Sequence, residues 1–491
     1  VAKLSVEHQL ERRLLDSGES SIELIQHQDD RLSSSADEPG GHAHCHDARG
    51  LHPLDVGSDV RSQDELANQV FEVRAGRPEG GCGALDAELG LLPADKAKLI
   101  IEAASVVTSG GADAEFPLST WQTGSGTQSN MNVNEVIASI ANERATGTRG
   151  GKSPIHPNDD VNLSQSSNDA FPSAIHIAAT LAVSKTLLPS LRHLHATISA
   201  KAAAWSDIVK IGRTHLQDAV PLTLGQEFGA HAAALAGDIA RIEAAQSELR
   251  AIALGGTAVG TGLNAHPEFA ERAAKAIAKL TGEPIVSAPN KFAALAGQEA
   301  TLAASAALRT TAATLMKLAN DVRWLASGPR AGLGELRIPE NEPGSSIMPG
   351  KVNPTQAEAL TMVCVQVYGL DAAIAFAASQ GNFQLNVFKP LIALDLLTQI
   401  RLLGDAARSF ADHCLAGTEP DAARITELLN DSLMLVTALT PVIGYDKAAE
   451  IAKRAHASGG TLRETALELG YISAEQFDAI VRPEKMTEAT R

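Results

Sequence analysis

The amino-acid sequence predicts an all-α fold built around a bundle of long helices. Apolar residues make up 44% of the 491 residues and aromatic residues only 3%. Long tracts rich in Ala and Leu favour helices that pack closely through small side chains. In the middle of the chain, apolar residues recur at spacings of three and four, as on a helix with one buried face. Three long segments show this pattern, with the apolar sets Leu187, Leu191, Leu194 and Ile198; Leu235, Ile239, Ile242 and Leu249; and Leu308, Leu315, Leu318, Val322 and Leu325.

Residues 1–85 differ from the rest, because they are rich in His, Gly, Arg and Asp and show little apolar periodicity. A GC-rich coding region gives this mixture when it is read in the wrong frame. We interpret the segment as misread, as a genuine replacement or as a disordered stretch. The His42, His44, Cys45 and His46 tract is compatible with metal binding, but its polar, Gly-flanked context favours disorder, and we predict no metal. The helical pattern begins near Leu89.

The second long helix has a readable start, because Thr223 and Gln226 form a capping-box pattern. Its N-terminus is therefore expected close to residues 212–215. After Pro420 the helical segments become shorter and are separated by Gly turns, which predicts a small helical C-terminal domain.

Charge and cysteine content exclude several classes of function. The formal net charge of −17 disfavours nucleic acid and anionic membranes as partners, so an anionic substrate needs a locally basic pocket. The four cysteines lack a C-x-x-C pair and are interpreted as reduced thiols rather than as zinc or iron–sulfur ligands. The chain has no apolar run of about 18 residues and an acidic N-terminal region, so we expect no membrane insertion and a cytoplasmic location.

Short polar residues gather in five segments: 123–134, 156–160, 164–169, 212–218 and 344–358. Each alone is explained by helix capping, but five together indicate a site. In the last segment, Gly and Pro at both ends describe a shaped loop that leads into a helix. With Asn353 as N-cap and Pro354 in the first turn, Lys351 and the free helix amides would meet a carboxylate at one place, which favours an anionic ligand.

The stretch from Gly344 to Asn353, Gly-Ser-Ser-Ile-Met-Pro-Gly-Lys-Val-Asn, resembles the signature of the fumarase/aspartase superfamily. Residues 123–132 and 156–169 resemble the class II fumarases closely. Aspartases tend to have Gly-Ala-Gly and Gln-Ser-Thr-Asn-Asp at these places, where this chain has Gly-Ser-Gly at 124–126 and Gln-Ser-Ser-Asn-Asp at 165–169. The resemblance covers roughly residues 86–491.

The resemblance implies a three-domain fold: the remainder of an N-terminal helical domain at 86–165, a central helical bundle at 166–421 and a small helical domain at 422–491. It implies a homotetramer whose long helices form one core and whose active sites each combine three chains. The implied reaction is the reversible hydration of fumarate, a small dicarboxylate, to L-malate in the tricarboxylic acid cycle. No metal and no other cofactor is expected.

The resemblance also implies individual roles. Ser345 takes the proton from C3, while Lys351 and Asn353 stabilise the enolate-like aci-carboxylate intermediate, because donors must already point where charge develops. His215, oriented by Glu358, activates the water that adds at C2. The substrate contacts implied are Ser125, Thr127, Ser166, Ser167, Asn168 and Thr214. A second anion site is implied at His156, Asn158 and Asp159, where the plainer interpretation is a turn and helix cap.

Three features do not fit this picture or are discounted. The Gly-Ala-Gln-Thr-x-Arg segment typical of class II fumarases is missing from residues 1–85. The Gly255–Gly262 stretch lacks a P-loop lysine and is interpreted as a shaped loop between helices, and the lone His231 and His266 as structural or solvent-facing. Two alternatives stay open: an aspartate ammonia-lyase, disfavoured by the 165–169 stretch, and a catalytically impaired structural homologue.

Overall fold

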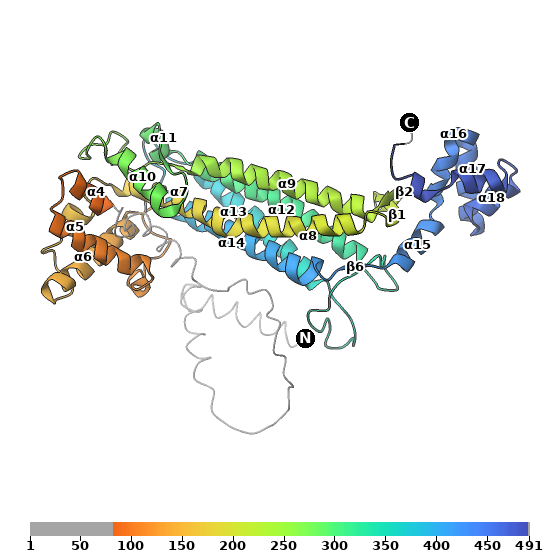
Figure 1. Cartoon of the computed structure of the whole chain (residues 1–491), viewed down its shortest axis with the longest axis horizontal. Coiled ribbons are helices and arrows are strands. Elements are labelled where there is room, and N and C mark those ends of the chain that lie inside the picture. The colour runs from red at the N-terminus through yellow and green to blue at the C-terminus, as the bar shows by residue number, and fades with distance from the viewer. Residues whose placement is uncertain (1–81, 490–491) are drawn as a thin grey trace, which may run out of the picture. The chain divides into compact units, whose positions relative to one another are not determined.

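The computed structural model describes residues 82–489, which are mostly helical (Figure 1). The α-helices are α4 (Cys82–Glu88), α5 (Ala94–Thr108), α6 (Thr127–Thr146), α7 (Ser167–Ala182), α8 (Leu188–Ala204), α9 (Leu224–Leu249), α10 (Phe269–Thr281), α11 (Lys291–Ala296), α12 (Glu299–Leu325), α13 (Thr355–Ala378), α14 (Lys389–Phe410), α15 (Ala422–Asp431), α16 (Thr440–Ile443), α17 (Tyr445–Ser458), α18 (Leu462–Glu468) and α19 (Ala474–Ile480). The short helical turns are η1 (Asp113–Glu115), η2 (Pro157–Val161), η3 (Val183–Leu187), η4 (Ala411–Leu415), η5 (Leu433–Leu439) and η6 (Pro483–Lys485). The strands pair two by two: β1 (Val209–Thr214) with β2 (Gln217–Thr223), β3 (Ala251–Ile252) with β4 (Val286–Ser287), and β5 (Leu336–Arg337) with β6 (Glu419–Pro420).

Five long helices, α8, α9, α12, α13 and α14, lie side by side and form the central bundle (Figure 1). The predicted all-α bundle is therefore confirmed, and the three predicted segments are α8, α9 and α12. The sequence pattern did not reveal α13 and α14 as further bundle helices. Apolar residues occur on all sides of α13, so this helix shows no single apolar stripe, and α14 is buried on most sides.

Helices α7 and α8 form one continuous run from Ser167 to Ala204, joined by the π-helical turn η3. The run contains Pro172 and Pro189, and a proline leaves the carbonyl four residues earlier without its usual amide donor. The wider turn η3 ends at Leu187, two residues before Pro189, and accommodates the proline, as π-turns in helices commonly do. Pro172 has no such turn beside it.

A β-hairpin that the sequence analysis did not predict precedes α9. In β1 and β2, Thr214 pairs with Gln217, so His215 and Leu216 form a two-residue turn with φ values of 57° and 59°. Such turns favour Asn-Gly, which explains why this one was not recognised. The predicted capping box of α9 is confirmed, since Thr223 and Gln226 bond each other's backbone amides.

The C-terminal helices have a hydrophobic core of their own, formed mainly by α15, η5, α17, α18 and α19. Ile211 of β1 belongs to this core, so the hairpin packs against these helices. The Gly turns predicted after Pro420 lie at Gly444, Gly459 and Gly470, and all three glycines have positive φ. The domain boundaries given above stay a prediction.

The helical part begins earlier than the sequence pattern indicated. Helix α4 starts at Cys82, a few residues before Leu89, and buries Leu85 and Asp86. Residues 1–81, with the His42–His46 tract, lie outside the described residues.

Two helical runs, Ser167–Ala204 and Thr355–Ala378, are long and apolar enough to cross a membrane by length and composition alone. The apolar window of the first is 72% buried inside the structure, as in a soluble core helix, whereas that of α13 is only 33% buried. A membrane is not needed to explain the first run, and the uncovered surface of α13 is considered below.

Candidate active site

The predicted site residues fall into two groups at opposite ends of the bundle. The hairpin with His215 directly precedes α9, and the Gly255–Gly262 loop follows its other end. Asn168 lies with that loop, because its Nδ2 donates to the Ala258 carbonyl at 2.8 Å. Helix α9 has 26 residues, which correspond to roughly 39 Å. His215 and Asn168 therefore cannot meet within one chain.

We call the first group the α7 end; it comprises residues 123–127, 166–169, 255–262 and 386–389. Ser125 is buried, and its Oγ lies 2.8 Å from Oγ1 of Thr127, the first residue of α6. A Cβ at position 124 would lie 1.4 Å from the Val387 carbonyl oxygen, so only glycine fits there. The predicted donors Ser125 and Thr127 are thus held by close backbone packing.

Asp169 anchors the start of α7 to the glycine loop. Ser166 caps α7 in a capping box with Asp169, whose Oδ1 accepts from the Ser166 amide at 2.9 Å. Its Oδ2 accepts from the amides of Gly255 at 2.9 Å and Thr257 at 2.8 Å. The interpretation of Gly255–Gly262 as a shaped loop holds, and its place beside α7 is new. The capping box was readable from the sequence, but the loop contact was not.

Two lysines that the sequence analysis did not single out lie close to Asp169. Lys389, the first residue of α14, is fully buried and donates from Nζ to the Asn168 carbonyl at 3.1 Å. Lys291 donates from Nζ to the Ile252 carbonyl at 2.9 Å. Burial lowers the pKa of each lysine to about 8, against the opposing attraction of Asp169. A lysine in the first turn of an apolar helix was the available sequence signal.

At the predicted second anion site, the polar groups form hydrogen bonds with one another. His156 is the N-cap of η2, and its Nδ1 accepts from the amides of Asn158 at 3.3 Å and Asp159 at 3.1 Å. The Asp160 carboxylate accepts hydrogen bonds from the His156 backbone amide and the Lys96 ammonium, both at 2.8 Å. These contacts favour the cap interpretation, and anion binding there stays a prediction.

We call the second group the hairpin end; it comprises residues 209–223 and 344–358. Ser345 Oγ accepts from the backbone amides of Ile347 at 3.3 Å and Met348 at 3.1 Å. Asn353 donates from Nδ2 to the Gly344 carbonyl at 2.6 Å and so closes the loop. The expectation that Asn353 caps the helix is wrong: Pro354 occupies the N-cap position, and α13 begins at Thr355.

Lys351 and Glu358 lie in this same region without contacting His215. Lys351 is exposed, and the Glu358 carboxylate lies 3.9 Å from the Arg323 guanidinium. Among the described residues, no ion pair joins Glu358 to His215 in one chain. Thr214, His215 and Leu216 at the hairpin tip are all exposed. Ser345, Lys351 and His215 thus share one end of the bundle but are not assembled into a site by a single chain.

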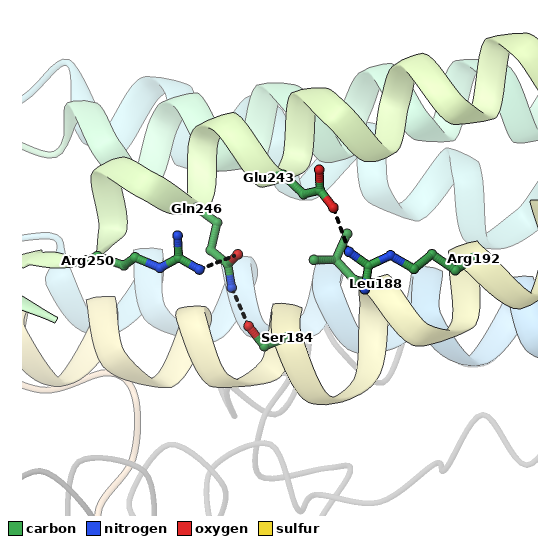
Figure 2. Close-up of a pocket in the computed structure, with 6 residues that line it drawn as sticks. All are labelled: Ser184, Leu188, Arg192, Glu243, Gln246 and Arg250. Atoms are coloured by element: carbon green, nitrogen blue, oxygen red, sulfur yellow. Dashed lines mark hydrogen bonds and ion pairs between the residues drawn. The ribbon is translucent and has the colours of Figure 1, made fainter. Parts of the chain in front are cut away.

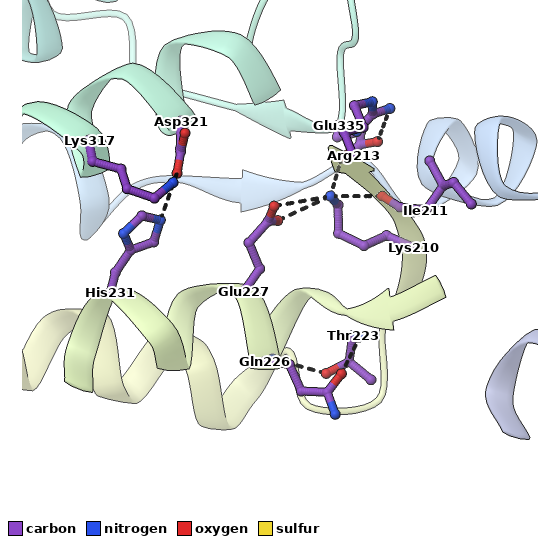
Figure 3. Close-up of polar contacts among 10 residues, drawn as sticks. All are labelled: Lys210, Ile211, Arg213, Thr223, Gln226, Glu227, His231, Lys317, Asp321 and Glu335. Carbon is purple, nitrogen blue, oxygen red and sulfur yellow. Dashed lines mark hydrogen bonds and ion pairs between the residues drawn. The ribbon is translucent and has the colours of Figure 1, made fainter. Parts of the chain in front are cut away.

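A buried ionic network supports the hairpin from below (Figure 3). Lys210 is 1% exposed, and its Nζ lies 3.1 Å from carboxylate oxygens of both Glu227 and Glu335. Arg213 reaches the same Glu335 at 2.7 Å. Glu335 precedes the 344–358 loop, so this network joins strand β1, which leads into the turn with His215, to the segment that leads into Ser345. His231, in the same view, is structural as expected, since its Nε2 lies 3.3 Å from Asp321.

A cavity of about 320 Å³ opens between the last turns of α9 and the start of α8 with the preceding η3 (Figure 2). Its two arginines are already engaged, Arg192 with Glu243 at 2.6 Å and Arg250 with Glu283 at 3.0 Å. It contains none of the predicted site residues. Within residues 82–489, no group of three or more His, Cys, Asp or Glu side chains is placed to hold a metal ion.

Comparison with protein families agrees with this arrangement. A family model described as a lyase matches residues 81–369, and one described as the fumarase C C-terminus matches residues 435–488. The bundle and its polar loops therefore define a lyase. The matched region includes both ends of the bundle.

Individual relatives narrow the class. The chain is 57% identical over 438 residues to a class II fumarate hydratase from Ralstonia nicotianae, covering 89% of this chain and 94% of the relative. It is 61% identical over 399 residues to one from Thermosynechococcus vestitus, covering 81% and 85%. The crystal structure of a class II fumarase from Schistosoma mansoni superimposes with a TM-score of 0.82 at 43% identity, covering 87% of this chain and 90% of that one. The chain belongs to the class II fumarate hydratase family.

Proposed function

We propose that this chain catalyses the reversible hydration of fumarate to L-malate. The observation that carries the proposal is the position of Ser345, whose Oγ receives two backbone amides of its own loop. A serine hydroxyl is a weak base, and donors aimed at its oxygen stabilise the alkoxide relative to the alcohol.

In the malate-to-fumarate direction, Ser345 takes the proton from C3 and leaves the neighbouring carboxylate as a dianionic, enolate-like group. Lys351 is exposed at the same loop and supplies the positive charge that stabilises this group. Asn353 contributes through the loop shape, since its side chain holds the Gly344 carbonyl. Loss of hydroxide from C2, protonated by His215, then gives fumarate and water.

We also propose that the active site combines several copies of the chain in a homotetramer. His215 and Ser345 lie at the hairpin end, whereas the carboxylate donors Ser125, Thr127 and Asn168 lie at the α7 end, so a complete site needs more than one chain. Helix α13 offers a surface for assembly, because its apolar Met362, Val365 and Phe376 are between 62% and 69% exposed. Contact with a second copy would cover this face and bring opposite ends together.

The direct test is ultraviolet absorbance of the purified chain with L-malate, and in parallel with L-aspartate. We expect fumarate from malate only. Fumarate from aspartate only would make the chain an ammonia-lyase, and no product from a folded, tetrameric preparation would support the impaired homologue.

The role of Ser345 is tested by Ser345→Ala, with Ser346→Ala as the matched control on the neighbouring, exposed residue. Removing the base is expected to lower kcat by roughly 10²–10⁴-fold. Equal activity of the two variants would contradict the assignment. Cytoplasmic location and a role in the tricarboxylic acid cycle belong to the same proposal, and cell fractionation with an antibody to the chain tests the former.

A further inference from the structure

The first turn of α7 contains a carbonyl that its own helix cannot satisfy. In an α-helix, the Asn168 carbonyl would accept from the amide of residue 172. That residue is Pro172, which has no N–H, and its ring also crowds the carbonyl four residues earlier. The turn that carries Ser166, Ser167 and Asn168 therefore starts with a missing hydrogen bond.

Lys389 supplies the missing donor. Its Nζ lies 3.1 Å from the Asn168 oxygen, and the side chain is fully buried. Two effects disfavour a lysine here: burial removes its hydration, and the N-terminus of a helix such as α14 repels positive charge. Attraction to Asp169, which is distant in sequence but close in space, offsets part of this. A charge retained against both effects indicates a specific task.

The same residue holds a second segment of the α7 end. The backbone amide of Lys389 donates to the Gly124 carbonyl at 3.1 Å. The preceding Val387 packs so closely against Gly124 that no side chain fits there. One residue therefore connects the turn with Asn168 to the turn with Ser125.

We propose that Lys389 is a positioning residue for the carboxylate-binding part of the active site, replacing the donor that Pro172 lacks and fixing Asn168 relative to Ser125. The inference rests on the proposed function, in which these two residues bind a substrate carboxylate. Lys389 does not touch the substrate in this scheme. Its effect is on binding, because the donors act on substrate and transition state alike.

The test compares four proteins: the natural sequence, Lys389→Met, Pro172→Ala and the double variant. Losing a charged hydrogen bond is expected to raise KM for fumarate about tenfold or more in Lys389→Met, with kcat changed less than about threefold. Pro172→Ala restores an amide donor to the Asn168 carbonyl. The double variant should therefore recover most of the lost KM.

Lys291→Met is the matched control, because this half-buried lysine also lies near Asp169 but donates to Ile252 instead of Asn168. Its effect should not be relieved by Pro172→Ala. Should Lys389→Met fail to fold, the comparison is repeated in an Asp169→Asn background, where fewer buried charges lack a counter-charge. An unchanged KM in folded Lys389→Met, or equal impairment with and without Pro172→Ala, would overturn the proposal.

Amide hydrogen exchange over residues 164–176 reads the same effect without substrate. We expect faster exchange in Lys389→Met and slower exchange again in the double variant. If the natural protein proves inactive on malate, the proposed function fails, and exchange alone decides whether Lys389 holds this turn. Exchange that is identical in all four proteins would sink the inference even if the enzyme is active.

Discussion

The two ends of the bundle are built differently. At the α7 end, Asp169 and Lys389 are buried, and three chain segments are held together by hydrogen bonds to them. At the hairpin end, the tip with His215 and most of the 344–358 loop are exposed, and only the supporting layer around Glu335 is buried. The α7 end is held together by contacts within one chain, whereas the hairpin end exposes its proposed catalytic groups on the surface.

This difference indicates a division of labour. The α7 end can be rigid before assembly because it only has to recognise a dicarboxylate with neutral donors. The groups proposed to move protons stand on a loop and a hairpin tip, where they can enter a site formed by another copy. The predictions below test this division, starting with the largest effect.

Variants damaged at opposite ends should rescue each other. Ser345→Ala and Asn168→Ala are each expected to lose most activity, with the former down roughly 10²–10⁴-fold. If sites combine both ends from different chains, co-expression of the two variants forms some sites with neither defect. We expect measurable malate dehydration from the mixed tetramers. A mixture no more active than its parents would mean that each site uses one chain, and mixing two variants of the same end provides the control.

Removing the buried carboxylate of the hairpin end should destabilise the protein strongly. Glu335 is 0% exposed and neutralises both Lys210 and Arg213. Glu335→Ala removes this shared carboxylate from both cations. The loss is expected to lower the free energy of unfolding by about 3–5 kcal/mol. Glu427→Ala, which removes an exposed partner of Arg424, should change it by less than about 1 kcal/mol. Similar denaturant midpoints for the two variants would refute the structural role of the network.

Asp86, which is buried beside the segment that leads into α7, should make the free energy of unfolding depend on pH. Burial raises the pKa of Asp86, which accepts from Ser164 Oγ at 2.8 Å, to about 7. Between about pH 4 and 7 the folded chain therefore retains a proton that the unfolded chain releases, so stability falls as pH rises through this window. Asp86→Asn should flatten the fall. Part of the pH dependence should remain in Asp86→Asn, because burial also raises the pKa of Asp395, to about 6.

Denaturant midpoints measured across that pH window check this prediction. Asp95→Asn, at an exposed position at the start of α5, is the control and should keep the full pH dependence. A slope unchanged in Asp86→Asn would show that Asp86 ionises normally in the folded chain.

The smallest expected effect is at the cap of α9. Thr223→Ala removes the side-chain bond to the Gln226 amide at 3.0 Å and should lower the free energy of unfolding by about 1 kcal/mol. Thr461→Ala breaks the same kind of capping box at α18 and should lower it similarly. Because only Thr223 borders the hairpin with His215, only that variant should also lower kcat. Equal kcat values for Thr223→Ala and Thr461→Ala would show that the cap of α9 does not affect the hairpin with His215.

Local features were predictable from the sequence. The capping box of α9 and the apolar faces of α8, α9 and α12 depend on residues a few positions apart, and the motif residues around Ser345 are contiguous. The hairpin was missed because His215 and Leu216 do not favour its turn. Asn353 was assigned to a cap because the sequence does not show that α13 begins only at Thr355, or that the Asn353 side chain donates to Gly344, nine positions earlier.

Long-range compensation was not predictable. Pro172 inside a predicted helix signals a missing hydrogen bond, but nothing local shows that the donor comes from Lys389, 217 positions later in the chain. The same holds for Asp169 and the Gly255–Gly262 loop. Such pairs arise from the packing of segments that are distant in sequence, and they decide how firmly the proposed site residues are held.

The packing of Ile211 into the C-terminal core has a consequence for how this enzyme family can vary. Strand β1 is anchored to the last helices of the chain, and its other end carries His215. Substitutions in those distant helices can therefore shift the histidine by fractions of an ångström while every residue near the reacting atoms stays the same. Natural variation, or directed evolution, has a place to adjust turnover there without altering which molecule is recognised.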